Sequence, residues 1–237
     1  MKRNTIIIIL LIASTLGLQA QQSFIIGLRG GGASSDMLLT ESVYDVYAHQ
    51  RTLGATYGLS MRYEFIPWAS VRLDGGIAQR GAHYSWEDIE YRLGVRYADF
   101  RLMGQLNPTF ESIGLTPYLA AGPYVALATS GTIDYSSMPT GDLSVPLSNG
   151  NFNGTDFGAV VLVGFEYALR CWLVALEAGP VWGLANSFAQ KELSGESTPL
   201  NNELTLQRNE GERLYRGAEV ALKVSYTIPL ANKKNHE

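Results

Sequence analysis

The sequence lacks several features that would assign it directly to a common protein class. Cys171 is the only cysteine among 237 residues, which excludes an internal disulfide and a cluster of thiolate metal ligands. Beyond the first twenty residues, no apolar run approaches the ~20 residues that a membrane-spanning helix needs. The formal net charge is −4, so the chain has no basic excess of the kind that binds nucleic acid.

The N-terminus has the pattern of a secretory signal peptide. Lys2 and Arg3 precede an apolar stretch over residues 6–18, which is short for a membrane span, and cleavage is expected after Ala20. Removing residues 1–20 leaves 16 basic residues against 22 acidic ones. An uncleaved anchor is the alternative interpretation of the same segment.

Alternation of apolar and polar residues is what the rest of the chain has in abundance. Over residues 54–65 every second residue is apolar, and the pattern resumes over residues 69–80. A period of two predicts a β-strand with one apolar and one polar face. The short segment 66–68, which contains Pro67, would join the two strands as a hairpin.

The same pattern predicts eight strands in total. They cover residues 23–32, 54–65, 69–80, 92–106, 117–129, 156–167, 172–184 and 213–228. No helical pattern is present to cover the apolar faces, so we expect them to face lipid. The prediction is an all-β protein: an eight-stranded antiparallel transmembrane β-barrel of the outer-membrane type over residues 21–230, followed by a charged tail at 231–237.

The connections between these strands alternate in length. Long loops are expected after residues 32, 80, 129 and 184, and shorter turns between the other strands, which places both termini in the periplasm. Aromatic side chains at the predicted strand ends suit the two membrane interfaces: Phe65, Trp68, Tyr167, Trp172, Trp86 and Trp182. A soluble eight-stranded barrel of the lipocalin kind, with its apolar face inside, is the alternative fold.

Four strand patterns resemble the PorT-like outer-membrane barrels of Bacteroidetes. They are VRLDGGIAQRGA (71–82), YADFRLMGQLN (97–107), PYLAAGPYVA (117–126) and DFGAVVLVGFEY (156–167). The resemblance extends over nearly the whole mature chain. It implies a small barrel in the bacterial outer membrane and a role as an accessory of type IX protein secretion.

Charged residues on the polar faces are the candidate functional site. The basic ones are Arg29, Arg62, Arg72, Arg80, Arg101 and Lys223, and the acidic ones are Glu64, Asp74, Asp99, Asp156, Glu166, Glu177 and Glu219. An eight-stranded barrel is only wide enough for side chains to fill it, so these charges must pair with one another. We expect a salt-bridged, filled lumen, and a narrow gated channel for small solutes is the alternative.

Enzymatic activity is not expected. His49 and His83 are placed in outer loops near Ser42, Asp45 and Ser85, which would suit a hydrolase at the rim, but no nucleophile motif surrounds them. No third ligand for a metal and no cofactor motif is evident. The outer loops carry apolar and aromatic residues that could contact a protein partner, so the predicted function is binding or scaffolding in contact with outer-membrane lipid.

Overall fold

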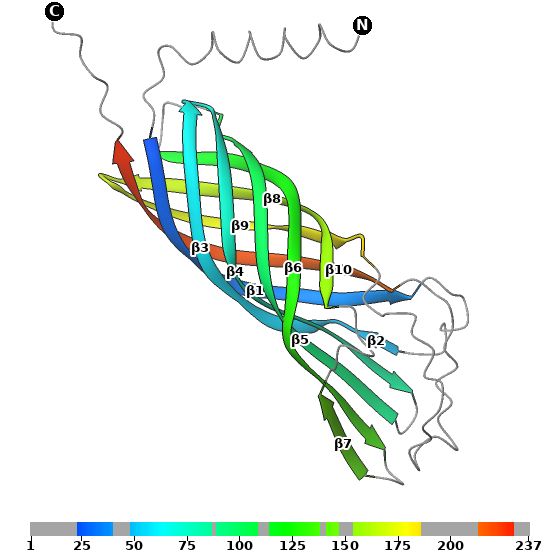
Figure 1. The fold of residues 1–237 in the computed structure, drawn as a ribbon. Helices are drawn as coiled ribbons and strands as arrows, with labels where there is room; N and C mark the ends of the chain where they lie inside the picture. The colour runs from blue at the N-terminus through cyan, green and yellow to red at the C-terminus, as the bar shows by residue number, and fades with distance from the viewer. Residues whose placement is uncertain are drawn as a thin grey trace, which may run out of the picture.

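The computed structural model describes residues 23–39, 48–86, 89–108, 114–137, 141–146, 154–185 and 213–229. These residues form ten β-strands (Figure 1). The strands are β1 (Ser23–Leu39), β2 (Ala48–Gln50), β3 (Thr52–Ile66), β4 (Ala69–Trp86), β5 (Ile89–Leu106), β6 (Leu115–Ser137), β7 (Gly141–Pro146), β8 (Thr155–Leu169), β9 (Trp172–Gly183) and β10 (Arg213–Pro229). Among the described residues, no helix is long and apolar enough to cross a membrane.

Eight of the strands close into an antiparallel barrel. The order is β4-β3-β1-β10-β9-β8-β6-β5, and pairing of β5 with β4 completes the circle. The first and last strands pair along their whole length, from Ser23↔Pro229 to Leu39↔Arg213. The structure therefore confirms the predicted closed barrel, which leaves no long unpaired edge.

The two ends of the barrel differ. At the turn end, short connections join β3 to β4 and β8 to β9, and the start of β1 and the end of β10 lie beside them (Figure 1). Arg170 adopts a positive φ of 58° in the tight β8–β9 turn. At the opposite end, the loop end, β4, β5 and β6 continue beyond the other strands, and the added strands β2 and β7 pair with β4 and β6.

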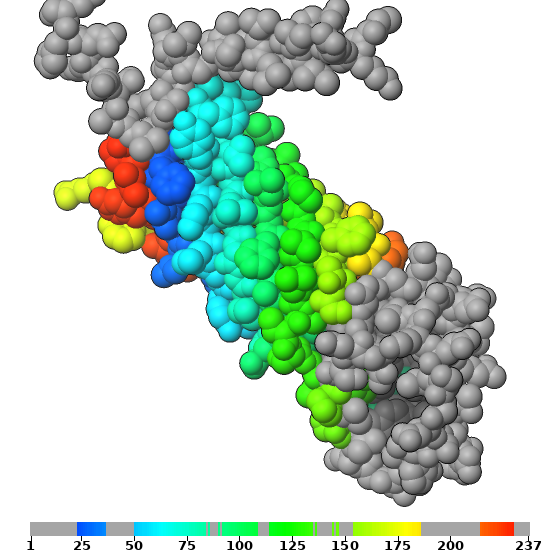
Figure 2. Space-filling model, viewed as in Figure 1, coloured from blue at the N-terminus to red at the C-terminus, as the bar shows by residue number. Residues whose placement is uncertain are grey.

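The outer face of the barrel carries an apolar belt. The strands from β10 through β1 to β6 lie side by side as one continuous surface (Figure 2). Exposed large apolar side chains alternate along every barrel strand, for example Leu73 on β4, Leu102 on β5 and Val163 on β8. The aromatic residues Phe65, Trp68, Tyr167 and Trp172 are exposed at the turn end, and Trp182 is exposed toward the loop end. This distribution matches a surface in contact with lipid.

The strands extend further toward the loop end than the sequence predicted. The expected loop after residue 32 is occupied as far as residue 39 by β1, and β2 lies within it. The expected loop over residues 81–91 is mostly strand, because β4 reaches Trp86 and β5 begins at Ile89. The third expected loop contains the rest of β6 and the whole of β7. The loop over residues 185–212 lies almost wholly outside the described residues.

The polarity of the two faces reverses near the loop end. A prediction that looks for outward apolar residues therefore ends the strands too early. On β4 the change begins after Gln79, and on the antiparallel β5 it covers the residues before Arg96. There the outward side chains become polar, whereas the inward ones, such as Leu93 and Val95, are apolar and buried. These inward residues belong to a hydrophobic core cluster that also includes Ala82 and Tyr97. The loop end is therefore built like a soluble β-sheet, with its apolar face covered inside.

Candidate functional site

The basic side chains of the lumen lie on one part of the inner wall. All six basic lumen side chains come from β1, β3, β4, β5 and β10. The strands β6, β8 and β9 contain no lysine or arginine, and their buried charged side chains are Asp156, Glu166 and Glu177. Long basic side chains thus reach across the lumen toward carboxylates on the opposite wall.

A continuous series of ion pairs fills the middle of the lumen, and we call it the central ion-pair chain. Its members, in order of contact, are Asp74, Arg72, Glu177, Arg29, Glu219, Arg101, Asp99 and Arg80. Each of these side chains is buried. Each internal member touches an opposite charge on both sides, so no member of the chain is buried without a partner.

Arg72 anchors the chain. Its Nε and Nη2 donate to Asp74 Oδ1 and Oδ2 at 2.8 and 2.6 Å. Its Nη1 and Nη2 donate to Glu177 Oε2 and Oε1 at 2.6 and 2.9 Å. Two bidentate pairs from one guanidinium are a geometry that lysine cannot reproduce. Glu177 also accepts from Arg29 Nε at 2.6 Å and from the Tyr118 hydroxyl at 2.7 Å.

A second, smaller group of charges lies at the turn end. Arg62 Nη1 and Nη2 donate to Glu166 at 2.8 and 2.9 Å, and Nη2 lies 3.0 Å from Glu64. Lys223 Nζ is 4.0 Å from Glu166 and 5.2 Å from the centre of the Tyr118 ring. The side chain of Glu64 is 26% exposed and also accepts from Ser23, so it marks the mouth of the lumen.

Arg80 closes the lumen toward the loop end. Its guanidinium carbon lies 4.6–5.2 Å from the ring centres of Tyr215, Tyr124 and Tyr97, a distance typical of cation–π contact. Arg80 also donates to Asp99 at 2.5 Å and to Asp156 at 2.7 Å. Three aromatic rings and two carboxylates therefore fix this cation.

Small residues on the inner wall make room for the long ones. A Cβ on Gly164 of β8 would lie 2.4 Å from Cζ of Tyr118, and a Cβ on Gly58 of β3 would lie 2.3 Å from the carbonyl oxygen of Gly75. Glycine at these two positions lets a ring or a neighbouring strand approach the wall closely. The lumen is filled because small and large inward residues complement one another.

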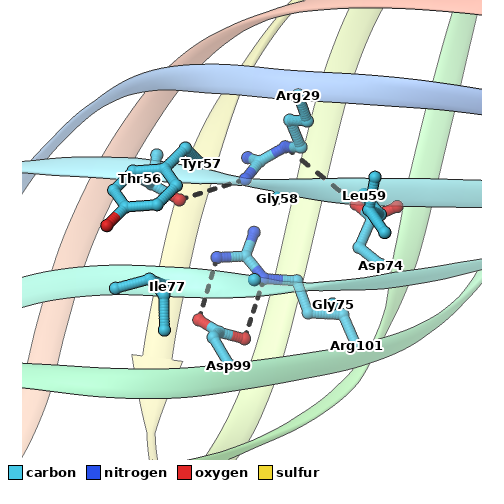
Figure 3. A pocket seen from close by; sticks show the side chains of 11 residues that line it. Arg29, Thr56, Tyr57, Gly58, Leu59, Asp74, Gly75, Ile77, Asp99 and Arg101 are labelled. Carbon is cyan, nitrogen blue, oxygen red and sulfur yellow. Dashed lines mark hydrogen bonds and ion pairs between the residues drawn. The ribbon is translucent and has the colours of Figure 1, made fainter.

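A pocket lies where three glycines leave the wall without side chains. It lies beside Gly58 on β3 and the adjacent Gly75–Gly76 pair on β4, and Arg29, Asp74, Asp99 and Arg101 border it from the lumen side (Figure 3). Arg29 donates to Thr56 at 3.3 Å and lies 4.0 Å from Asp74, and Arg101 pairs with Asp99. The charges that border the pocket are thus already paired with one another.

The structure brings together every lumen charge that the sequence singled out. Arg29, Arg62, Arg72, Asp74, Asp99, Arg101, Glu166, Glu177, Glu219 and Lys223 are buried inside the barrel, as are Arg80 and Asp156, and Glu64 lies at its mouth. Sequence reasoning missed Tyr97 and Tyr215 as partners of Arg80. Both lie at inward positions within the predicted strands 92–106 and 213–228, so the alternation of those strands could have identified them.

The two histidines do not lie in loops, and that prediction was wrong. His49 lies on β2 and His83 on β4, paired in neighbouring register. The Nε2 atom of His83 is 3.8 Å from Glu90, whereas Ser42 and Asp45 lie outside the described residues. Within the described part of the chain, no group of three or more histidine, cysteine, aspartate or glutamate side chains could hold a metal ion.

Comparison with known proteins gives the family. A family model described as "Outer membrane protein beta-barrel domain" matches residues 19–189, well over half of the chain. A search of curated proteins finds no significant match.

Solved structures with a similar fold are outer-membrane barrels. They include OprG from Pseudomonas aeruginosa (14% identity, TM-score 0.44, covering 91% of this chain and 99% of that one) and Neisserial surface protein A (15%, 0.43, 86% and 96%). They also include Ail, the attachment invasion locus protein of Yersinia pestis (12%, 0.41, 89% and 100%). The chain belongs to the outer membrane protein β-barrel domain family and resides in the bacterial outer membrane.

Proposed function

We propose that this protein is a closed barrel that acts as a binding or scaffold component of the outer membrane and does not conduct solutes at rest. The central ion-pair chain is the observation that supports this proposal most directly. It crosses the lumen, where Glu177 accepts from both Arg72 and Arg29 at 2.6–2.9 Å. An axial path would have to separate several buried ion pairs, each of which is costly to break.

The loop end is the part of the molecule that we propose contacts a protein partner. Strands β4, β5, β6 and β7 project there beyond the barrel (Figure 1). Their outward side chains, among them Arg92, Arg96, Thr132 and Asp134, are exposed. A rigid sheet outside the lipid, carried by a closed barrel, has the architecture of a membrane-anchored docking platform.

The more specific proposal is that the chain is a PorT-like accessory of type IX protein secretion. The support for it is the resemblance of four strand patterns, which lie on β4, β5, β6 and β8. Under this proposal the partner is a protein of the secretion apparatus, and no nucleic acid is involved.

Two measurements test the proposed function together. Wild-type protein in a planar lipid bilayer is expected to show no steady conductance. Affinity purification from the native outer membrane is expected to retain a protein partner, which Arg96→Glu at the loop end weakens and Arg170→Glu at the turn end does not. Steady conductance of the wild type, or equal retention by both variants, would contradict the proposal.

A narrow gated channel is the second candidate. It is favoured by the polar character of the lumen, which contains six basic and seven acidic side chains where an apolar core would suffice for stability. A channel would show voltage- or ligand-dependent openings in the same bilayer recordings, so one experiment separates the two candidates.

A further inference from the structure

Two of the eight seams between barrel strands are interrupted in the middle of the apolar belt. Between β5 and β6 the register runs to Arg101↔Tyr124 and resumes at Gly104↔Ala121. Between β8 and β9 it runs to Val160↔Val181 and resumes at Val163↔Ala178. In the described strands, the other six seams continue through the belt without such a gap.

Each gap coincides with a Gly-Pro step. Gly122 and Pro123 lie in the β6 strand, and Gly179 and Pro180 lie in the β9 strand. Proline has no backbone N–H, so it cannot donate to the neighbouring strand and is normally excluded from central strands. Lipid offers no replacement donor, and the backbone hydrogen bonding is therefore weaker at these two places than elsewhere in the wall.

The two weak seams border the same pair of strands. Between them lie β6 and β8, whose own register is unbroken from Leu115↔Tyr167 to Leu127↔Thr155. We call this two-strand unit the panel. Its inner face is largely apolar or small, with Ala120, Val160 and Leu162 fully buried.

The lumen charges divide along the same line. Every member of the central ion-pair chain belongs to β1, β4, β5, β9 or β10, and none to the panel. The panel is tied across the lumen by Asp156, 2.7 Å from Arg80, and by Glu166, 2.8 Å from Arg62. These two ion pairs lie toward opposite ends of β8, and we call them the latches. The Tyr118 hydroxyl adds one hydrogen bond, to Glu177.

We propose that the panel is a displaceable part of the barrel wall, held by the two latches, whose outward movement opens the lumen sideways to the lipid while the central ion-pair chain stays intact. The apolar faces on both sides of the panel define what such an opening would admit, namely the aliphatic chain of a membrane lipid or a similarly apolar molecule. This proposal does not rest on the scaffold function.

Amide hydrogen exchange of the wild-type protein in lipid nanodiscs tests the proposal without any substitution. The amides beside the gaps, such as those of Met103 on β5 and Leu162 on β8, are expected to exchange at least about tenfold faster than those of the β1–β10 seam. Equal protection of all seams would overturn the proposal. Replacement of the proline by Pro123→Val is expected to slow exchange at the β5–β6 gap. Pro117→Val is the control, because Pro117 lies beyond the end of the β5–β6 register.

The latches are tested by the ratio of exchange at the two gaps to exchange at the β1–β10 seam. This ratio corrects for a general loss of stability. Arg62→Gln removes the Glu166 latch without changing any member of the central ion-pair chain, and is expected to raise the ratio several-fold at both gaps. Arg72→Gln breaks the central chain at its links to Asp74 and Glu177 but leaves both latches in place, and is expected to leave the ratio unchanged. An equal rise in both variants, or a rise in neither, would refute the assignment of the latches.

Discussion

Arg72 and Leu73 are neighbours on β4 that point to opposite sides of the barrel wall. Arg72 is 0% exposed inside the lumen, and Leu73 is 49% exposed in the apolar belt. Each side chain should be damaging in the other's position. Leu73→Arg places a charge in lipid and is expected to cost ~2–4 kcal/mol of unfolding free energy, the range for arginine near the bilayer midplane.

The loss of unfolding free energy in Arg72→Leu follows from the contacts that the two carboxylate partners of Arg72 keep. Glu177 keeps Arg29 at 2.6 Å and the Tyr118 hydroxyl at 2.7 Å, whereas Asp74 keeps only Arg29 at 4.0 Å. The variant therefore leaves one buried carboxylate almost unpaired, for which the expected cost is ~3–5 kcal/mol. Adding Asp74→Asn should recover part of this loss, because the stranded charge is removed. Arg72→Lys should fall between wild type and Arg72→Leu, since lysine cannot form both bidentate pairs.

The assay is reversible urea unfolding in phospholipid vesicles, followed by tryptophan fluorescence, with the shift in midpoint read at constant m-value. Arg92→Leu is the control, because Arg92 pairs with Glu90 at 3.1 Å but the two side chains are 63% and 49% exposed. That variant should lose no more than about 1 kcal/mol. If Leu73→Arg is as stable as wild type while Arg72→Leu is no worse than the control, the inner and outer faces are assigned wrongly.

Three further predictions follow from particular contacts. Thr132→Cys in a Cys171→Ser background should react with a membrane-impermeant maleimide on whole cells, whereas the native Cys171, exposed in a turn at the other end, should not; the reverse labelling would invert the topology. Gly164→Ala should destabilise the barrel by ~1–3 kcal/mol in urea unfolding, because its Cβ displaces the Tyr118 ring from contact, and Tyr118→Leu should suppress part of that loss. Arg62→Gln should leave bilayer conductance at zero, since the central ion-pair chain does not include this residue; steady current in this variant would place the barrier at the turn end.

Within the lipid-facing belt, the sequence was enough to assign the strands and their faces. Alternation is a local property: successive side chains on a strand point to opposite sides, so Leu73 outside implies Arg72 inside whatever the rest of the chain does. The same reasoning applies to Tyr118 and Tyr124, which lie an even number of residues apart and are both buried, although both faces of their strand are apolar or small.

Toward the loop end, sequence reasoning failed because it expected apolar residues to face outward. Between Gln79 and the loop end on β4, and between Arg96 and the loop end on β5, the strands leave the lipid. The alternation continues there with the opposite polarity. The predicted strand over residues 92–106 includes Leu93 and Val95, but residues 81–91 carry no outward apolar pattern and were assigned to a loop. A criterion that accepts either polarity would have extended β4 and β5.

Only the tertiary structure decided which basic side chain pairs with which carboxylate. Arg62 pairs with Glu166, 104 residues away, and Arg29 pairs with Glu219, 190 residues away. These pairings depend on the register of every seam around the barrel, because closure and strand tilt determine which inward residues lie at the same height in the lumen. The sequence by itself determined that these side chains lie inside, since the pleat of each strand depends only on neighbouring residues. The pairing of β1 with β10, and the room left by residues such as Gly164, determined their partners.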